Sequence, residues 1–228
     1  MANPRQDPVV NTIRKDGKPV TRDQVPWTLR PFPTPERLLH TFRINARIPS
    51  SAQPLGGWEA PDCELRGHYV GGHYLSAAAL MYASTGDEDL KNQANTVVVE
   101  LAKCQTALKS GYLSAFPVES FDRLRNREKV WAPFYTIHKI MAGNLDMYVP
   151  CGDEQALDVA RKIAEWVAGY TGRLSSDHLQ RVLGTEFGGM GEVLSNLYAV
   201  TGGNIISKLR DGSTRNCFLI HSPIAATN

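Results

Sequence analysis

The sequence predicts an all-α protein in which pairs of helices repeat along the chain. An apolar segment, 73–84, is followed by an amphipathic one, 88–105, and the same order returns at 135–148 and 154–168. A third apolar segment begins at Gly188. The apolar segments share a tyrosine followed four residues later by a glycine: Tyr82/Gly86, Tyr148/Gly152 and Tyr198/Gly202. This alternation indicates stacked helical hairpins, with the apolar helix of each pair on the inside.

The N-terminal residues differ from this pattern. Residues 1–34 are polar and rich in proline, which predicts an extended arm. Residues 35–46 have the pattern of a short helix, and residues 48–62 have the proline, glycine and serine content of a loop. Trp58 lies in this loop beside acidic residues, a mixture common both in carbohydrate sites and in ordinary ordered loops.

The first hairpin carries its own start and stop signals. Segment 73–84 is apolar on nearly every side, so we expect a helix that is buried on most of its surface. Gly86 suits the left-handed position that ends a helix, and Asp87 is a candidate N-cap for the next one. The second hairpin repeats these signals, since Gly152 and Asp153 stand between its helices.

The connections between hairpins distinguish two kinds of helical array. Residues 106–133 join the first two hairpins and are rich in aromatic and charged side chains. A long connection of this kind favours a closed α/α toroid, whereas a superhelical solenoid usually has shorter and more uniform ones. In a toroid such loops meet the N-terminal ends of the inner helices, and we expect the functional site there.

Composition argues against several classes of function. Lys and Arg number 25 against 23 Asp and Glu, so the net charge of +2 gives no reason to expect nucleic acid or a membrane as partner. No apolar run approaches the roughly 18 residues that span a bilayer. The four cysteines form no CxxC motif, which argues against a zinc ribbon or a redox site. The N-terminus lacks the apolar stretch of a signal peptide, so a cytoplasmic location is the default expectation.

Two histidines are candidates for ligand binding. His73 and His138 lie at equivalent positions near the N-terminal ends of the first two inner helices. A helix N-terminus favours the neutral imidazole, which is a good hydrogen-bond partner for sugar hydroxyls. The alternative is a buried histidine that bonds the backbone.

Charged residues give further candidates. Glu186 and Glu192 flank the start of the third inner helix, and paired carboxylates can perform glycoside hydrolysis. The alternative for Glu186 is a helix cap or an ion pair with an arginine. His68 and His73 are five residues apart, which would put them on different faces of an α-helix and argues against a zinc site. A dense charged cluster before the first inner helix either binds a polar ligand or pins its loop by an ion pair: Asp62, Glu64, Arg66 and His68.

Seven segments of the sequence resemble one known family. In chain order they read SSAQPLGGWEAPDCELRGH, GHYLSAAALMYASTGD, ELAKCQ, GYLSAFP, FDRL, VWAPFYTIHKIMAG and EFGGMGEVLSNLYAVTG. They are similar to the beta-L-arabinofuranosidase family, glycoside hydrolase family 127, over about 37–202. The resemblance implies an (α/α)6 toroid of the six-hairpin glycosidase kind and hydrolysis of terminal L-arabinofuranosyl or related glycosidic bonds. It also implies a retaining mechanism with a zinc-held cysteine nucleophile and a glutamate acid/base.

This sequence differs from the family in features that change the expected organisation of the chain. The zinc-binding cysteines and catalytic glutamate of the family belong to the later half of the barrel, and nothing in this sequence matches them. We therefore expect no catalytic residue, metal ligand or cofactor in this chain, and interpret it as a truncated toroid that is inactive alone. The expected parts are an arm over 1–34, half a toroid over 35–203 and an irregular tail over 204–228 that does not match the family. The family pattern GHxxGHYL occurs here as GHYVGGHYL, with one extra glycine at position 71 or 72.

The residues that transfer from the family are those lining its sugar pocket. His138, within the motif YTIHK, is the first candidate for a hydrogen bond to the substrate, an arabinose-containing glycan. The other substrate-binding candidates are His73, Tyr135, Trp58, Glu186 and Glu192. A non-catalytic carbohydrate-binding protein or a helical scaffold is the alternative function.

Overall fold

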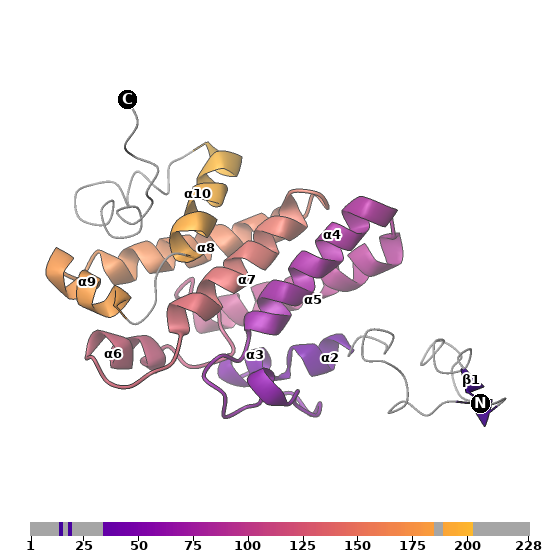
Figure 1. Ribbon diagram of the computed structural model, residues 1–228, viewed down its shortest axis with the longest axis horizontal. Helices are drawn as coiled ribbons and strands as arrows, with labels where there is room; N and C mark the ends of the chain where they lie inside the picture. Colours follow the sequence, from indigo (N-terminus) through magenta and orange to yellow (C-terminus); the bar gives the residue numbers. More distant parts are fainter. Residues whose placement is uncertain (1–13, 16–17, 20–33, 185–188, 203–228) are drawn as a thin grey trace. The chain divides into compact units, whose positions relative to one another are not determined.

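A computed structural model describes residues 14–15, 18–19, 34–184 and 189–202 of the protein (Figure 1). The chain divides into two units, Met1–Thr34 and Pro35–Asn228. In the first unit, strand β1 (Arg14–Lys15) pairs antiparallel with β2 (Lys18–Pro19). The sequence did not predict this short ladder, and most of the expected arm and all of the expected tail lie outside the described residues.

The described part of the second unit is helical, as predicted. None of its helices is long and apolar enough to cross a membrane. In chain order the helices are α2 (Pro35–Leu38), α3 (His40–Asn45), η3 (Gly57–Glu59), η4 (Tyr69–Tyr74), α4 (Leu75–Thr85), α5 (Glu88–Leu108), α6 (Glu119–Arg125), α7 (Pro133–Tyr148), α8 (Glu154–Thr171), α9 (Ser176–Leu183) and α10 (Gly189–Thr201).

The long helices form an inner and an outer layer. Helix α7 contacts η4, α4 and α10 within the inner layer, and the outer helices α5 and α8 contact each other. Each outer helix also packs on its own inner partner, α5 on α4 and α8 on α7, so each pair is a hairpin (Figure 1). This is the layering of an α/α toroid, and it confirms the predicted hairpins.

The residues that end one helix and cap the next have the roles that the sequence predicts. The Asp87 carboxylate accepts the Leu90 N–H at 3.0 Å, and the Asp153 carboxylate accepts the Ala156 N–H at 3.0 Å. Each N-cap of this type stabilises its helix by about 1 kcal/mol. Gly86 ends α4 with a φ of 69°, the left-handed conformation that glycine adopts without strain.

The connection between the first two hairpins is part of the core. It brings aromatic side chains against α8, where the Phe121 and Tyr112 rings each lie 4.8 Å from the Trp166 ring. The Tyr112 hydroxyl donates to the Phe116 carbonyl at 2.8 Å, so its burial leaves no polar atom unpaired. The connection, which includes α6, is therefore fixed in place against the outer helix α8.

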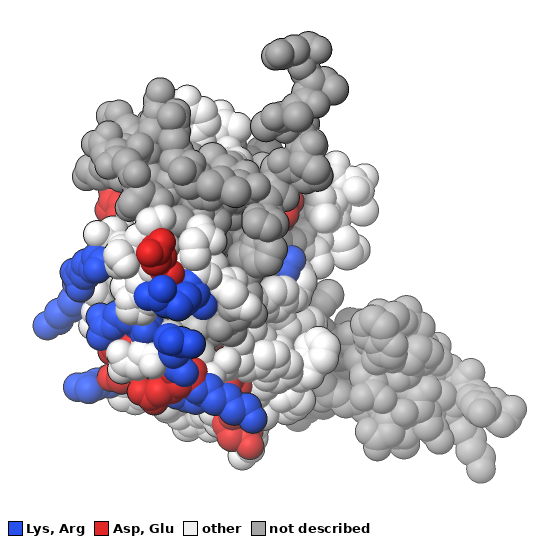
Figure 2. All heavy atoms as spheres, turned by 60° about the vertical axis from the view of Figure 1, so that its left-hand side comes forward, with Lys and Arg blue, Asp and Glu red and all other residues white. Residues whose placement is uncertain are grey.

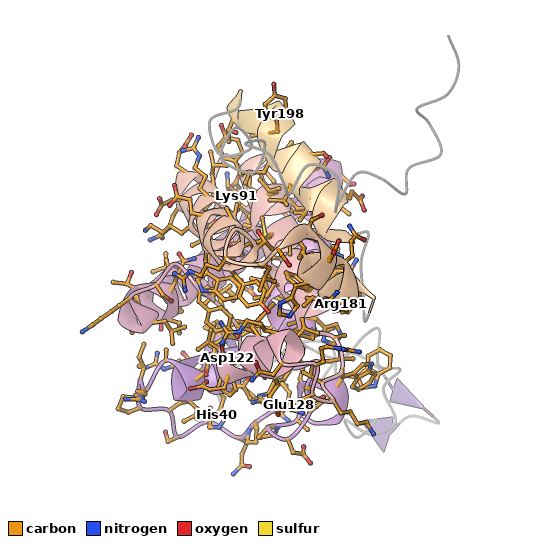
Figure 3. The ribbon with its side chains drawn as sticks, turned by 90° about the vertical axis from the view of Figure 1, so that its left-hand side faces the viewer. His40, Lys91, Asp122, Glu128, Arg181 and Tyr198 are labelled. Carbon is orange, nitrogen blue, oxygen red and sulfur yellow. The ribbon has the colours of Figure 1, made fainter. Side chains whose placement is uncertain are left out.

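One expectation about α4 is wrong. Its apolar composition predicted burial on most sides, yet Leu80 is 62% exposed and Met81 is 50% exposed. Among the described residues α4 packs chiefly on α5, α7 and η4, so one face has no helix against it. At the opposite end of the inner layer, Tyr198 of α10 is 49% exposed and projects away from the helices (Figure 3).

Candidate functional site

The first inner helix begins with a π-helix, η4, rather than with an α-helical turn. A π-helix bonds residue i to residue i+5, so its turns are wider and hold one more residue. The extra glycine of GHYVGGHYL is accommodated in this turn. Because residue i+5 then lies above residue i, the expectation that His68 and His73 fall on different faces is wrong. Their ring centroids are 5.6 Å apart, in an edge-to-face arrangement.

Glycines bring η4 and α7 into backbone contact. A Cβ atom added to Gly72 would lie 2.7 Å from the Lys139 carbonyl oxygen. A Cβ atom added to Gly143 would lie 2.6 Å from the carbonyl oxygens of both Gly71 and Gly72. No side chain separates the two helices here, and this close approach places the histidine-bearing turns next to each other.

Five ring side chains from three segments meet at this end of the inner helices, and we call them the ring cluster. The Trp58 ring, from η3, lies 5.9 Å from the His68 ring. The Tyr135 ring, from α7, lies 5.9 Å from the His68 ring and 5.2 Å from the His138 ring. The members of the ring cluster are Trp58, His68, His73, Tyr135 and His138.

The ring cluster has an exposed upper layer and a buried base. Trp58 is 65% exposed and His73 is exposed, whereas His138 and His68 are buried. Four of the six residues predicted to bind substrate are therefore together. Of the other two, Glu192 is an exposed residue in the first turn of α10, and Glu186 lies outside the described residues.

Glu59 holds the base of the ring cluster. Its carboxylate is buried and accepts the N–H groups of Gly67 at 2.7 Å and Tyr69 at 2.8 Å. The same carboxylate lies 3.3 Å from Nδ1 of His68, which is also 2.7 Å from the Leu65 carbonyl oxygen. Because a carbonyl only accepts, Nδ1 carries a hydrogen. Sequence reasoning missed Glu59, since its partners are eight to ten residues away across a loop.

The three histidines of the ring cluster differ in their protonation. Burial disfavours a charge on His68, but hydrogen bonds to Glu59 and to the Leu65 carbonyl outweigh it and raise the His68 pKa. Burial, followed by the nearby Lys139 ammonium, lowers the pKa of His73 and lowers that of His138 to about 4. These lowered pKa values favour the neutral imidazole of both residues at pH 7, and their causes are burial and Lys139 rather than the helix N-terminus expected from the sequence.

The first residue of α10 contacts the His138 ring. A Cβ atom added to Gly189 would lie 2.5 Å from Nε2 of His138, so only glycine fits there without a shift. Hydrogen bonds to the backbone of Phe134 and Tyr135 act on the His138 pKa against its burial. His138 thus combines features of both interpretations, a buried ring bonded to the backbone and a member of the ring cluster.

The charged cluster before the first inner helix separates into two parts. The Arg123 guanidinium donates to the Glu64 carboxylate at 2.8 Å, and the same carboxylate accepts the Trp131 N–H at 2.7 Å. Arg66 donates to the carbonyl oxygens of Ala115 and Cys63. These residues pin the loop, as the ion-pair alternative predicted, whereas His68 belongs to the ring cluster.

Other features of the described residues lie apart from the ring cluster. A cavity of about 770 Å³ between α3, the end of α5 and the following loop is lined by none of its members. Acidic and basic side chains lie next to one another on the face shown in Figure 2. In the described ranges, no group of three or more His, Cys, Asp or Glu side chains could hold a metal ion.

The comparisons with known proteins agree with this architecture. A family model described as beta-L-arabinofuranosidase, GH127 catalytic domain, matches residues 22–209. The match begins within the segment expected to form the arm and ends within the segment expected to form the tail. No curated protein matches the chain.

Proposed function

This chain belongs to the beta-L-arabinofuranosidase GH127 catalytic-domain family, and on that premise we propose that its ring cluster binds a terminal L-arabinofuranosyl group. Membership implies glycoside hydrolase-like function and a carbohydrate substrate. The observation that carries the proposal is the meeting of Trp58, His73 and His138 at the N-terminal ends of two inner helices.

The chemistry of the ring cluster suits a sugar. Sugar sites combine apolar or aromatic surface with a few fixed polar groups. The exposed Trp58 ring offers a flat face to the C–H groups of a furanose. The neutral imidazole of His73 can donate one hydrogen bond and accept another, which matches a hydroxyl group that does the same. The N–H of the neutral His138 ring bonds the backbone, so its other nitrogen is the one that can accept a hydrogen bond from a hydroxyl group. Glu192, in the first turn of α10, and Glu186 remain proposed contributors to the same site.

We further propose that this chain binds the sugar without cleaving its glycosidic bond. The family resemblance implies a zinc-held cysteine nucleophile, but the described residues do not offer the donor set that zinc requires. Burial raises the pKa of the Cys104 thiol to about 12, so this cysteine is not a ready nucleophile. This non-catalytic carbohydrate-binding role differs from the glycoside hydrolase-like function that family membership implies only in whether turnover occurs.

Calorimetric titration with methyl β-L-arabinofuranoside tests the binding. The His138→Ala variant should bind at least about tenfold more weakly, because a buried hydrogen-bond partner is lost. His40→Ala is the matched control, since the His40 ring bonds Ser50 Oγ at 3.0 Å outside the ring cluster. Unchanged affinity in His138→Ala would contradict the proposed site.

An assay with an aryl β-L-arabinofuranoside, with and without added zinc, tests the second proposal. We expect no turnover above that of a preparation of the His138→Ala variant. Turnover by the wild-type chain that disappears in the variant would refute the proposed inactivity while supporting the sugar site.

A further inference from the structure

We propose that Glu59 and His68 form a buried ion pair that positions the ring cluster, with Glu59 acting as a positioning residue that does not touch the sugar. The inference rests on the proposed function, because it assigns the means by which the same site is held ready. It concerns two residues that the family resemblance did not single out.

The carboxylate of Glu59 fixes the backbone on both sides of His68. Its two oxygens accept the N–H groups of Gly67 and Tyr69, at 2.7 and 2.8 Å. These donors lie at the start of η4, where N–H groups have no partner within the helix. Glu59 is 5% exposed, and a buried carboxylate persists only where such partners satisfy it. The backbone position of His68 therefore depends on Glu59.

The ring of His68 is the centre of the ring cluster. Three of its ring contacts, to Trp58, His73 and Tyr135, have centroid distances between 5.6 and 5.9 Å. His68 is 3% exposed, so it lies beneath the exposed Trp58 and His73 rings. Its Nδ1 atom is held between the Glu59 carboxylate and the Leu65 carbonyl, which sets the orientation of the ring. A shift of His68 would displace all three neighbours.

The charged groups around His68 and His73 act on the protonation of both rings. Glu59 from η3 favours the protonated ring, and Lys139 from α7 opposes it. His73 from η4 and Tyr135 from α7 also face the ring. The pKa of His73 is lowered by partial burial of its ring and then by the positive charges of Lys139 and His68, whereas the Glu59 carboxylate raises it. The two members of the pair thus act on the His73 pKa in opposite directions, and the effect of the pair lies in the position and protonation of His68.

Titration of the wild-type histidine ring resonances by NMR is the first test. We expect His68 to lose its proton at a higher pH than either His73 or His138. This measurement needs no variant, so it applies even if substitution of Glu59 prevents folding. A His68 ring that titrates below the other two would overturn the proposal.

The Glu59→Gln variant is the second test, and Glu128→Gln is its matched control. Glu128 is an exposed acid that lies outside the ring cluster. In Glu59→Gln the pKa of His68 should fall, because the carboxylate that favours its protonated ring is lost. Arabinoside affinity should fall in the same variant, because a glutamine amide has one accepting oxygen and cannot receive the N–H groups of Gly67 and Tyr69 as the two carboxylate oxygens do. Identical histidine titrations in Glu59→Gln and wild type would overturn the proposal.

The two proposals fail in different ways. If the wild-type chain binds no arabinoside but its histidines titrate in the expected order and respond to Glu59→Gln, the sugar site is wrong and the ion pair stands. If the chain binds the sugar but the histidine pKa values are the same in Glu59→Gln and in the wild type, the ion pair is wrong and the sugar site stands.

Discussion

The close contact between η4 and α7 predicts that a methyl group added at Gly143 lowers the free energy of unfolding. In Gly143→Ala the new Cβ atom would lie 2.6 Å from the carbonyl oxygens of Gly71 and Gly72 and 2.9 Å from the Gly72 Cα atom. All three are backbone atoms, so no rotamer change can relieve the overlap and the two helices must separate. Overpacking of a core typically costs about 1–3 kcal/mol, and three backbone clashes place this site at the upper end.

The helix itself partly offsets this cost. Alanine is favoured over glycine within a helix by about 1 kcal/mol, so the net loss in the free energy of unfolding should be about 2 kcal/mol. With a urea m-value of about 2 kcal/mol/M, the midpoint of unfolding should fall by about 1 M. Urea titration followed by far-UV circular dichroism measures this shift.

A second helical glycine provides the control. A Cβ atom added to Gly169 in α8 would meet nothing within 4 Å. Gly169→Ala should therefore gain the helix preference without a clash and raise the free energy of unfolding by about 0.5–1 kcal/mol. If Gly143→Ala is as stable as Gly169→Ala, the close contact between η4 and α7 is not present in the protein.

Two further predictions concern the caps and the buried histidine. Asp87→Ala and Asp153→Ala should each lower the free energy of unfolding by about 1 kcal/mol in urea titrations, and equal stability to wild type would show that these caps do not form. The His138 pKa of about 4 lies below its ordinary 6.5, so the unfolded chain binds the proton first and stability should fall as the pH drops from 6.5 to 4. Between pH 6.5 and pH 4, protonation of His138 should lower the free energy of unfolding by roughly 2–3 kcal/mol. A His138→Asn variant should lack this contribution when its stability at pH 7 and at pH 5 is compared with that of the wild type. The same pH dependence in both proteins would contradict the lowered pKa.

The features that the sequence predicted are those set by neighbouring residues. Gly86 and Asp87 determine where one helix ends and the next begins, and their partners are within four residues. The alternation of apolar and amphipathic segments likewise depends only on local spacing. These signals sufficed for the hairpins and for their inner and outer assignment.

The features that the sequence missed depend on tertiary contacts or on an unusual turn. The joint position of His68 and His73 requires η4 to be a π-helix, and the available signal was the extra glycine at 71 or 72. Glu59 is the last residue of η3, and nothing in the neighbouring sequence indicates that its carboxylate accepts the N–H groups of Gly67 and Tyr69. The exposure of Leu80 was missed because composition shows that a helix is apolar but not which neighbours cover it.

The glycine contact between η4 and α7 also bears on the thermodynamics of ligand binding. Backbone atoms have no rotamers, so the spacing between the turns that carry His73 and His138 does not depend on side-chain rearrangement. A ligand that bridges these turns meets groups that are already ordered, and it loses little conformational entropy of the protein on binding. A larger share of the free energy of the hydrogen bonds that it makes can then appear as affinity than at a site whose backbone must first be ordered.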